Sequence, residues 1–294
     1  AIRDYSQYEK GPVCCVGVME GKLVVSVANK VLLYQWDVEK RSLIGRGFYD
    51  TQVYVVSMKV YRNFILCADY RRGLHLLAWD RDMRLIVHVA RDPGVCHVLS
   101  THFAFNGSKL GLIATSMAKR LQIFRFMPED EDSRVGQKLL LTSDTYLGKK
   151  ASSLALLRAR NLPLSELDAL AESKRIGGSS ASIRSVNLGA TAEGGYFKIM
   201  PLETLIHRRL LSVVLSITKT IQQTAGLNPI QARQHSADSQ RYAKSQTIID
   251  GDLLATYLSL DRPTQRKVAE NIGSSPEVII ENLLQIQLAT TLAV

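Results

Sequence analysis

A hairpin of two apolar segments recurs along the first two thirds of this chain. In its clearest copy, residues 62–80, the apolar segments 64–68 and 74–79 are joined by a charged turn that contains Gly73. Similar hairpins occupy residues 21–37, 108–126 and, in a degenerate form, 185–202. The copies start roughly 40 residues apart, which is the spacing of four-stranded propeller blades.

The repeat predicts a mainly β protein with an α-helical tail. We expect residues 1–203 to form β-propeller blades, with a loop inserted into the last blade at residues 161–185, where Ser, Ala, Gly and charged residues dominate. Four blades are few for a closed ring, and an incomplete ring leaves unpaired strand edges. We therefore expect the blades to be part of a larger propeller, completed either by upstream sequence or by another chain.

The hydrophobic period changes from two to 3.6 residues at Leu202, which predicts a small C-terminal helical domain over residues 204–294. The first helix should bury one stripe, formed by Leu202, Ile206, Leu210, Val213, Ile217 and Ile221. We expect Gly226 to end this helix and the Asn228-Pro229 pair to prevent it from restarting.

Two later helices have recognisable starts. The residues Asp250-Gly251-Asp252 are typical of a helix start. They lack the further ligands of a calcium-binding loop. The last helix should begin at Pro276 and turn one apolar face inward, formed by Ile279, Leu283 and Ile286.

The formal net charge of +10 favours acidic partners such as RNA, DNA or acidic protein surfaces, although a basic solvated surface explains it equally well. No string of basic and aromatic residues of the kind that stacks RNA bases occurs. Contacts to a phosphate backbone stay open, and the candidate residues are Lys149, Lys150, Arg158, Arg160, Arg208 and Arg209.

No catalytic, cofactor-binding or metal-binding motif passes its spacing test. Gly148-Lys149-Lys150 lacks the Ser or Thr and the first Gly of a phosphate-binding loop, and neither a GxSxG nor an HExxH motif occurs. The chain therefore indicates no cofactor and no enzyme. The longest apolar helix is interrupted by polar residues, so we expect no membrane span.

The dipeptides Trp36-Asp37 and Trp79-Asp80 look like those of WD repeats. The His and the second Asp of the WD tetrad do not recur, so we interpret each Trp as packing between neighbouring blades.

Several stretches together resemble the C-terminal region of the largest subunit of the cleavage and polyadenylation specificity factor. The likeness keeps its order along nearly the whole chain. The residues that carry it are Lys10-Gly11-Pro12-Val13, Phe48-Tyr49-Asp50-Thr51-Gln52-Val53-Tyr54, Arg62-Asn63-Phe64-Ile65-Leu66-Cys67-Ala68-Asp69, Met127-Pro128-Glu129, Gly226-Leu227-Asn228-Pro229 and Ile249-Asp250-Gly251-Asp252-Leu253-Leu254.

The same superfamily contains the large subunit of the UV-damaged-DNA-binding protein and a large splicing factor 3b subunit, which share the Asp-Gly-Asp-Leu element. This chain departs from the family pattern at Gly194-Gly195-Tyr196-Phe197 and at Ala232-Arg233. Contacts near those positions are the least transferable.

The resemblance implies a non-catalytic nuclear scaffold in pre-mRNA 3′-end cleavage and polyadenylation. It implies WD-repeat and zinc-finger subunits as protein partners, with pre-mRNA contacted mostly through them. The alternative is a propeller adaptor of a splicing, ubiquitin-ligase or DNA-repair complex.

Overall fold

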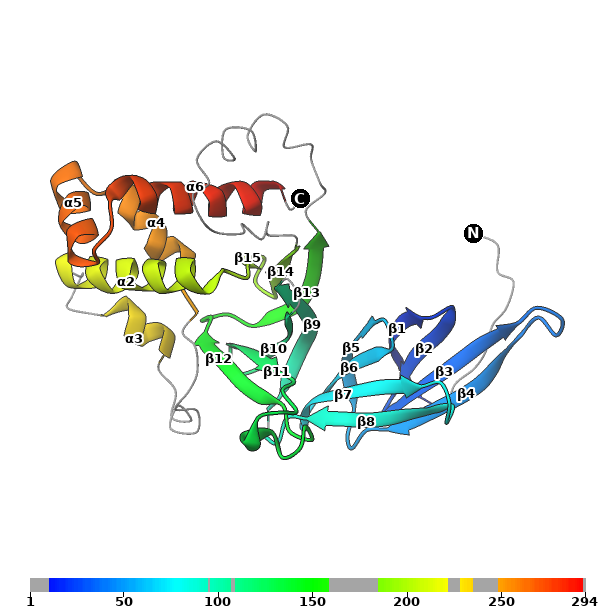
Figure 1. Ribbon diagram of the computed structural model, residues 1–294. Helices are drawn as coiled ribbons and strands as arrows, with labels where there is room; N and C mark the ends of the chain where they lie inside the picture. Colours follow the sequence, from blue (N-terminus) through cyan, green and yellow to red (C-terminus); the bar gives the residue numbers. More distant parts are fainter. Residues whose placement is uncertain are drawn as a thin grey trace.

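The computed structural model describes residues 11–94, 96–106, 109–158, 185–221, 228–234 and 248–292. Four antiparallel sheets follow one another in chain order, and helices come after them (Figure 1). The predicted mainly β fold with a helical tail is confirmed. The predicted insert lies outside the described residues except for Ser185, which is the first residue of a strand.

Within each sheet, the strands pair in the order in which they occur along the chain. The first sheet contains β1 (Val13–Met19), β2 (Lys22–Val27), β3 (Lys30–Asp37) and β4 (Ser42–Asp50). The second contains β5 (Val55–Tyr61), β6 (Phe64–Asp69), β7 (Gly73–Asp80) and β8 (Leu85–Arg91). The third contains β9 (Val98–Asn106), β10 (Lys109–Ser116), β11 (Arg120–Arg125) and β12 (Leu140–Tyr146), with a short 3₁₀ helix η1 (Glu131–Ser133) before β12. The fourth contains only β13 (Ala151–Arg158), β14 (Ser185–Thr191) and β15 (Tyr196–Ile199).

The sheets pack face to face through strands that are apolar on both sides. In β7, Leu74 and Leu76 belong to the core shared with the third sheet, whereas Leu77 and Trp79 belong to the core shared with the first. Side chains alternate between the two faces of a strand, so a sheet covered on both faces needs uninterrupted apolar runs. The first strands β1, β5, β9 and β13 contact one another in succession. This is the arrangement of propeller blades.

The two tryptophans have different environments. Trp79 is 5% exposed and packs between the first and second sheets, as predicted, whereas Trp36 is 40% exposed. The side chain of Trp36 lies on the side of the first sheet that no described sheet covers, so its packing against a neighbouring blade stays a prediction.

Hydrogen bonds join each later sheet to its neighbour. The Thr101 N–H donates to Ser57 Oγ at 3.2 Å, and Thr115 Oγ1 donates to the Ala151 carbonyl at 2.9 Å. Asn187 Nδ2, itself buried, donates to the Phe103 carbonyl at 2.9 Å. Because these bonds are buried or nearly so, breaking one leaves an unsatisfied polar group, and they fix the alignment of the sheets.

The helices build a separate apolar core. They are α2 (Thr204–Thr220), α3 (Pro229–Gln234), α4 (Gly251–Ser259), α5 (Arg262–Asn271) and α6 (Pro276–Leu292). All the residues predicted to line the inner faces of the first and last helices lie in or against this core. Two predictions for the helices were wrong. The first helix, α2, ends at Thr220 with Ile221 as its C-cap, before Gly226 is reached. The second concerns Pro229. It is the first residue of α3, and Asn228 Oδ1 accepts from the Ile230 N–H at 3.0 Å, so the pair starts a helix.

The helices lie on the β14–β15 side of the fourth sheet (Figure 1). Lys198 Nζ of β15 donates to the Thr290 carbonyl of α6. Ile248, just before α4, packs in the same cluster as Phe197 and Ile199 of β15. The helical part is therefore anchored next to β15, at the edge of the fourth sheet where each of the other sheets has a fourth strand.

Gly189 allows a close aromatic contact within the fourth sheet. A Cβ at this position would lie 2.2 Å from Phe197 Cζ, on the strand that pairs with β14. We expect Gly189→Ala to lower the free energy of unfolding by about 1–3 kcal/mol through overpacking, measured by urea denaturation. Gly45→Ala is the control, since its new methyl group would meet only Tyr34 Cε1 at 4.0 Å. Equal effects of the two substitutions would contradict the contact.

Burial of His75 should make the stability pH-dependent. The side chain is 2% exposed, and neither ring nitrogen has a hydrogen-bond partner among the described residues. Burial, and to a smaller extent the neighbouring His88, lowers the pKa of His75 to about 4. A pKa below the unfolded value means that this contribution is present above about pH 6.5 and is lost as the pH falls towards 4, by up to about 3 kcal/mol. Unfolding of the wild type and of His75→Leu should be compared between pH 7 and 4.

The variant should lose less stability over this range than the wild type. His97→Gln, at an exposed position, is the control and should behave like the wild type. Parallel curves for wild type and His75→Leu would contradict a role for His75 in acid sensitivity.

Candidate interaction surfaces

The outer face of the first sheet, on the side away from the second sheet, is apolar, and none of the described sheets or helices covers it. Val16 and Val18 of β1 are 62% and 70% exposed, while Met19, on the inner side of the same strand, is 1% exposed. The register places the side chains of Val16 and Val18 beside Val25 and Leu23, and Phe48 of β4 lies opposite Leu32. We define the outer face as the exposed and half-buried residues Val16, Val18, Leu23, Leu32, Tyr34, Trp36 and Phe48, which lie around the buried Val25.

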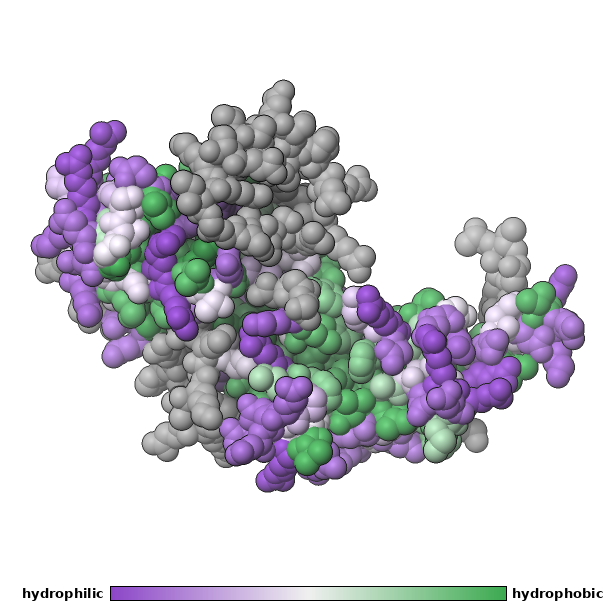
Figure 2. Space-filling model, in the orientation of Figure 1, coloured by the Kyte–Doolittle hydropathy of each residue, from purple (hydrophilic) through white to green (hydrophobic). Residues whose placement is uncertain are grey.

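Exposed apolar faces on sheets are a frequent feature of surfaces that bind protein. Figure 2 shows apolar residues at the surface of the sheets among hydrophilic ones. At one end of the outer face, Lys30 Nζ lies 5.7 Å from the centroid of the Phe48 ring and 3.5 Å from Asp50 Oδ1. The face is therefore apolar in the middle with charges at its border, which is the composition of a protein–protein interface.

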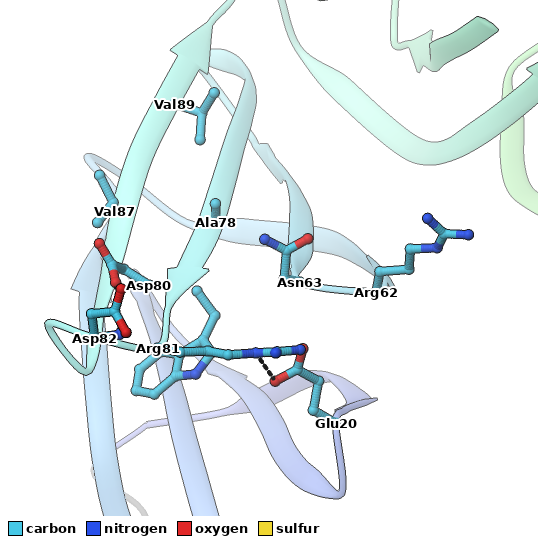
Figure 3. A pocket seen from close by; sticks show the side chains of 10 residues that line it. Glu20, Arg62, Asn63, Ala78, Asp80, Arg81, Asp82, Val87 and Val89 are labelled. Atoms are coloured by element: carbon cyan, nitrogen blue, oxygen red, sulfur yellow. Dashed lines mark hydrogen bonds and ion pairs between the residues drawn. The ribbon is translucent and has the colours of Figure 1, made fainter. Parts of the chain in front are cut away.

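A groove of about 980 Å³ lies at the turns of the first and second sheets (Figure 3). It is lined by Glu20, Arg62, Asn63, Ala78, Trp79, Asp80, Arg81, Asp82, Val87 and Val89. Arg81 points to Glu20 and forms an ion pair with it, which links the β1–β2 turn to the β7–β8 turn. Asp80 Oδ1 accepts from the Asp82 N–H at 2.9 Å, so its carboxylate stabilises the turn. The groove offers no nucleophile with a neighbouring base.

The thiols and the carboxyl group whose pKa values are shifted are buried groups of the fold. Burial raises the pKa of the Cys15 and Cys67 thiols and raises that of Cys96 to about 12, so none forms a thiolate nucleophile at neutral pH. Burial raises the pKa of Asp92 to about 6, and its Oδ1 accepts from the Gly94 N–H at 2.9 Å in the turn after β8. The described residues contain no cluster of His, Cys, Asp and Glu that could hold a metal ion.

The structure separates the predicted phosphate-binding residues. Lys149 and Lys150 are exposed just before β13, and Arg158 is the last residue of that strand, about 26 Å beyond Lys150 at roughly 3.3 Å per residue. Arg208 and Arg209 lie on α2, in the helical part. Arg160 lies outside the described residues. These residues do not form one surface, although the two lysines stay together.

The family-motif residues have local structural functions where they are described. Asp250 caps α4, because its side chain accepts from the Asp252 N–H at 3.1 Å, while Leu253 packs against the helical core. Asn228 and Pro229 start α3 as described above, whereas Gly226 and Leu227 lie outside the described residues. The Asp-Gly-Asp element is a helix start, as its composition predicted.

None of the sequence motifs pointed to the outer face. A signal for it was present, because β2 and β3 read LVVSV and VLLY without the polar alternation of a strand that has one side in water. Such runs predict burial on both faces, whereas on the outer side the described chain buries Val25 and leaves Val16, Val18 and Phe48 of the other strands exposed.

No helix among the described residues is long and apolar enough to cross a membrane.

Comparisons with known proteins agree with the resemblance found in the sequence. Rice has a probable cleavage and polyadenylation specificity factor subunit 1 that is 31% identical over 98% of this chain. The subunit 1 proteins of Arabidopsis thaliana and Drosophila melanogaster are each 28% identical, over 98% and 96% of the chain. In each case the chain spans 19% of the length of the relative.

The family model described as the CPSF A subunit region matches residues 5–259, which include all four sheets and the first three helices of the structure. A match over this much of the chain, together with relatives that align along nearly its entire length, leads to one assignment: the chain belongs to the CPSF A subunit region family.

Proposed function

We propose that this chain is a non-catalytic scaffold region that holds protein subunits of the pre-mRNA 3′-end cleavage and polyadenylation complex in the nucleus. The names of the relatives support the process. The outer face of the first sheet is the observation that supports a scaffold, because a rigid stack of sheets with an uncovered apolar side is suited to bind protein.

The partners are the WD-repeat and zinc-finger subunits that read the polyadenylation signal, and pre-mRNA is contacted mostly through them. Residues 1–203 and 204–294 act as two domains, the sheets providing the binding surfaces and the helices a fixed end. Because the chain spans only 19% of its relatives, other regions of such proteins contribute surfaces of their own.

The chemistry of the described side chains supports the proposal that the chain is non-catalytic. Burial keeps the thiols of Cys15, Cys67 and Cys96 protonated, Arg81 of the groove pairs with Glu20, and no group of potential metal ligands gathers in the described residues.

Charges on the outer face should abolish binding of protein partners. We expect the double variant Val16→Asp, Val18→Asp of the full-length protein to retain less than about a tenth of the wild-type amount of its partner subunits after affinity purification, because burying unpaired carboxylates costs several kcal/mol. Val38→Asp, Val135→Asp is the matched control, since these valines are 78% and 92% exposed in turns. If the control loses as much as the double variant, or neither loses any, the outer face is not the interface.

The purified protein should not read the polyadenylation hexamer by itself. Sequence-specific RNA recognition needs base-edge contacts or free stacking surfaces, and the sequence contains neither motif. RNAs with an intact and a scrambled hexamer should bind within about threefold of each other at physiological salt. A preference of tenfold or more for the intact hexamer, about 1.4 kcal/mol, would contradict a scaffold that contacts RNA secondarily.

A further inference from the structure

The antiparallel order of every sheet brings particular turns to the same end. The turn between the second and third strands of a sheet, and the connection to the next sheet, both lie at the end where the first strand begins. We call this the connection end. Its turns and connections are residues 28–29, 51–54, 70–72, 92–94, 96–97, 117–119, 147–150 and 192–195.

Contacts join these segments into one continuous surface from the second sheet to the fourth. Each contact links a turn to a neighbouring connection. In chain order they are the Tyr70 N–H to the Tyr54 carbonyl at 2.8 Å, the Tyr70 ring against His97 at 5.2 Å between centroids, the Met117 N–H to the His97 carbonyl at 2.8 Å, the Leu147 N–H to the Lys119 carbonyl at 2.8 Å and the Ala192 N–H to the Lys150 carbonyl at 3.0 Å.

Cations gather on this surface although they are scattered in the sequence. Arg71 and Arg72 come from the second sheet, Lys119 from the third, and Lys149 and Lys150 from the connection to the fourth. All are exposed except Lys119, which is half-buried.

Among the described residues, the acidic groups of the connection end pair with one of these cations, Lys149, whose Nζ lies 3.4 Å from Glu193 Oε2. Asp69 and Asp92 are buried, and their carboxylates accept backbone N–H groups, including those of Arg71 at 3.0 Å and Gly94 at 2.9 Å. Asp144 is nearly buried and pairs with Arg120. Among the described residues no ion pair forms with Arg71, Arg72, Lys119 or Lys150.

The opposite end of the sheets has a different charge pattern. Its turns contain exposed carboxylates as well as cations. The carboxylates belong to Glu39, Asp82, Glu129, Glu131 and Asp132. The excess positive charge is thus a property of the connection end and not of the sheets in general.

We propose that the connection end of the second, third and fourth sheets binds the phosphate backbone of single-stranded RNA. Unpaired cations along a curved row of turns can follow a flexible strand of phosphates, and each neutralised phosphate releases counterions. The choice of RNA rests on the proposed function. Neither Tyr54 nor Tyr70 is a free stacking surface for bases, because Tyr54 Oη is 2.8 Å from Cys14 Sγ and the Tyr70 ring packs on His97.

The test compares two triple variants of the full-length protein. Arg71→Glu, Arg72→Glu, Lys150→Glu changes the connection end, and Lys40→Glu, Arg84→Glu, Lys109→Glu makes the same change in net charge at the opposite end. With a fluorescent 20-nucleotide oligouridylate at 100 mM salt, the first should weaken binding by about tenfold or more and reduce the salt dependence of log Kd by about 2, while the second stays within about threefold of the wild type. Thermal melting checks that both variants fold.

A second measurement locates the contact directly. Oligouridylate should protect Lys119 and Lys150 from acetylation, as detected by mass spectrometry, and leave Lys40 and Lys109 reactive. Glu193→Gln should strengthen binding severalfold, because Lys149 Nζ lies 3.4 Å from Glu193 Oε2 and the substitution releases this cation.

Equal losses in the two triple variants, or protection of Lys40 and Lys109 only, would overturn the proposal. Tighter binding of a poly-glutamate peptide than of oligouridylate would also overturn it, because the surface would then bind an acidic protein. These experiments use RNA and purified protein, so their failure is distinct from a failure to capture protein subunits.

Discussion

The packing of each sheet on the next, through strands that are apolar on both faces, is the interaction on which the rest of the structure depends. Leu76 and Leu77 are consecutive in β7, yet they belong to the two different cores on either side of the second sheet. Burying both faces of a strand removes more apolar surface from water per residue than a one-sided sheet can. The same requirement means that a sheet at the end of such a stack exposes an apolar face, which is the situation of β1–β4.

Buried polar groups then make the stack specific. Apolar faces alone tolerate sliding, whereas the hydrogen bonds of Ser57 with Thr101 and of Asn187 with Phe103 are satisfied in one alignment only. Buried carboxylates such as Asp69 hold the turns through backbone N–H groups, from Val53 at 2.8 Å as well as from Arg71. Because these carboxylates are occupied, the cations beside them on the connection end stay available to a ligand.

Much of the fold could be predicted because it follows from patterns in short stretches of the sequence. The hairpin repeat gave the strands, and the change of period at Leu202 gave α2 and its buried stripe. Prediction was weaker where the outcome depends on distant partners. Trp36 and Trp79 have the same local sequence pattern, but within the described part of the chain a neighbouring sheet packs on Trp79 and not on Trp36. Pro229 is compatible with either a helix stop or a helix start, and only the backbone around Asn228 decides between them.

The candidate surfaces were less predictable than the fold. Lys149 and Lys150 were found as a local pair, but Arg71, Arg72 and Lys119 join them only through the order of the turns, which no short motif encodes. Arg158 was grouped with the two lysines by sequence proximity, and the length of β13 places it at the other end of the strand. Charge patterns on stacked sheets are set by topology, and linear spacing does not reveal them.

The central claim is that the outer face of the first sheet is covered by protein when the chain is part of its complex. Carbene footprinting with mass spectrometry measures this directly, because it labels apolar side chains in proportion to their exposure. We expect Val16, Val18 and Phe48 to be labelled strongly in the isolated chain and weakly in the full-length protein within the purified complex, while Val135 is labelled equally in both. Strong labelling of Val16 and Val18 in the assembled complex would contradict the claim.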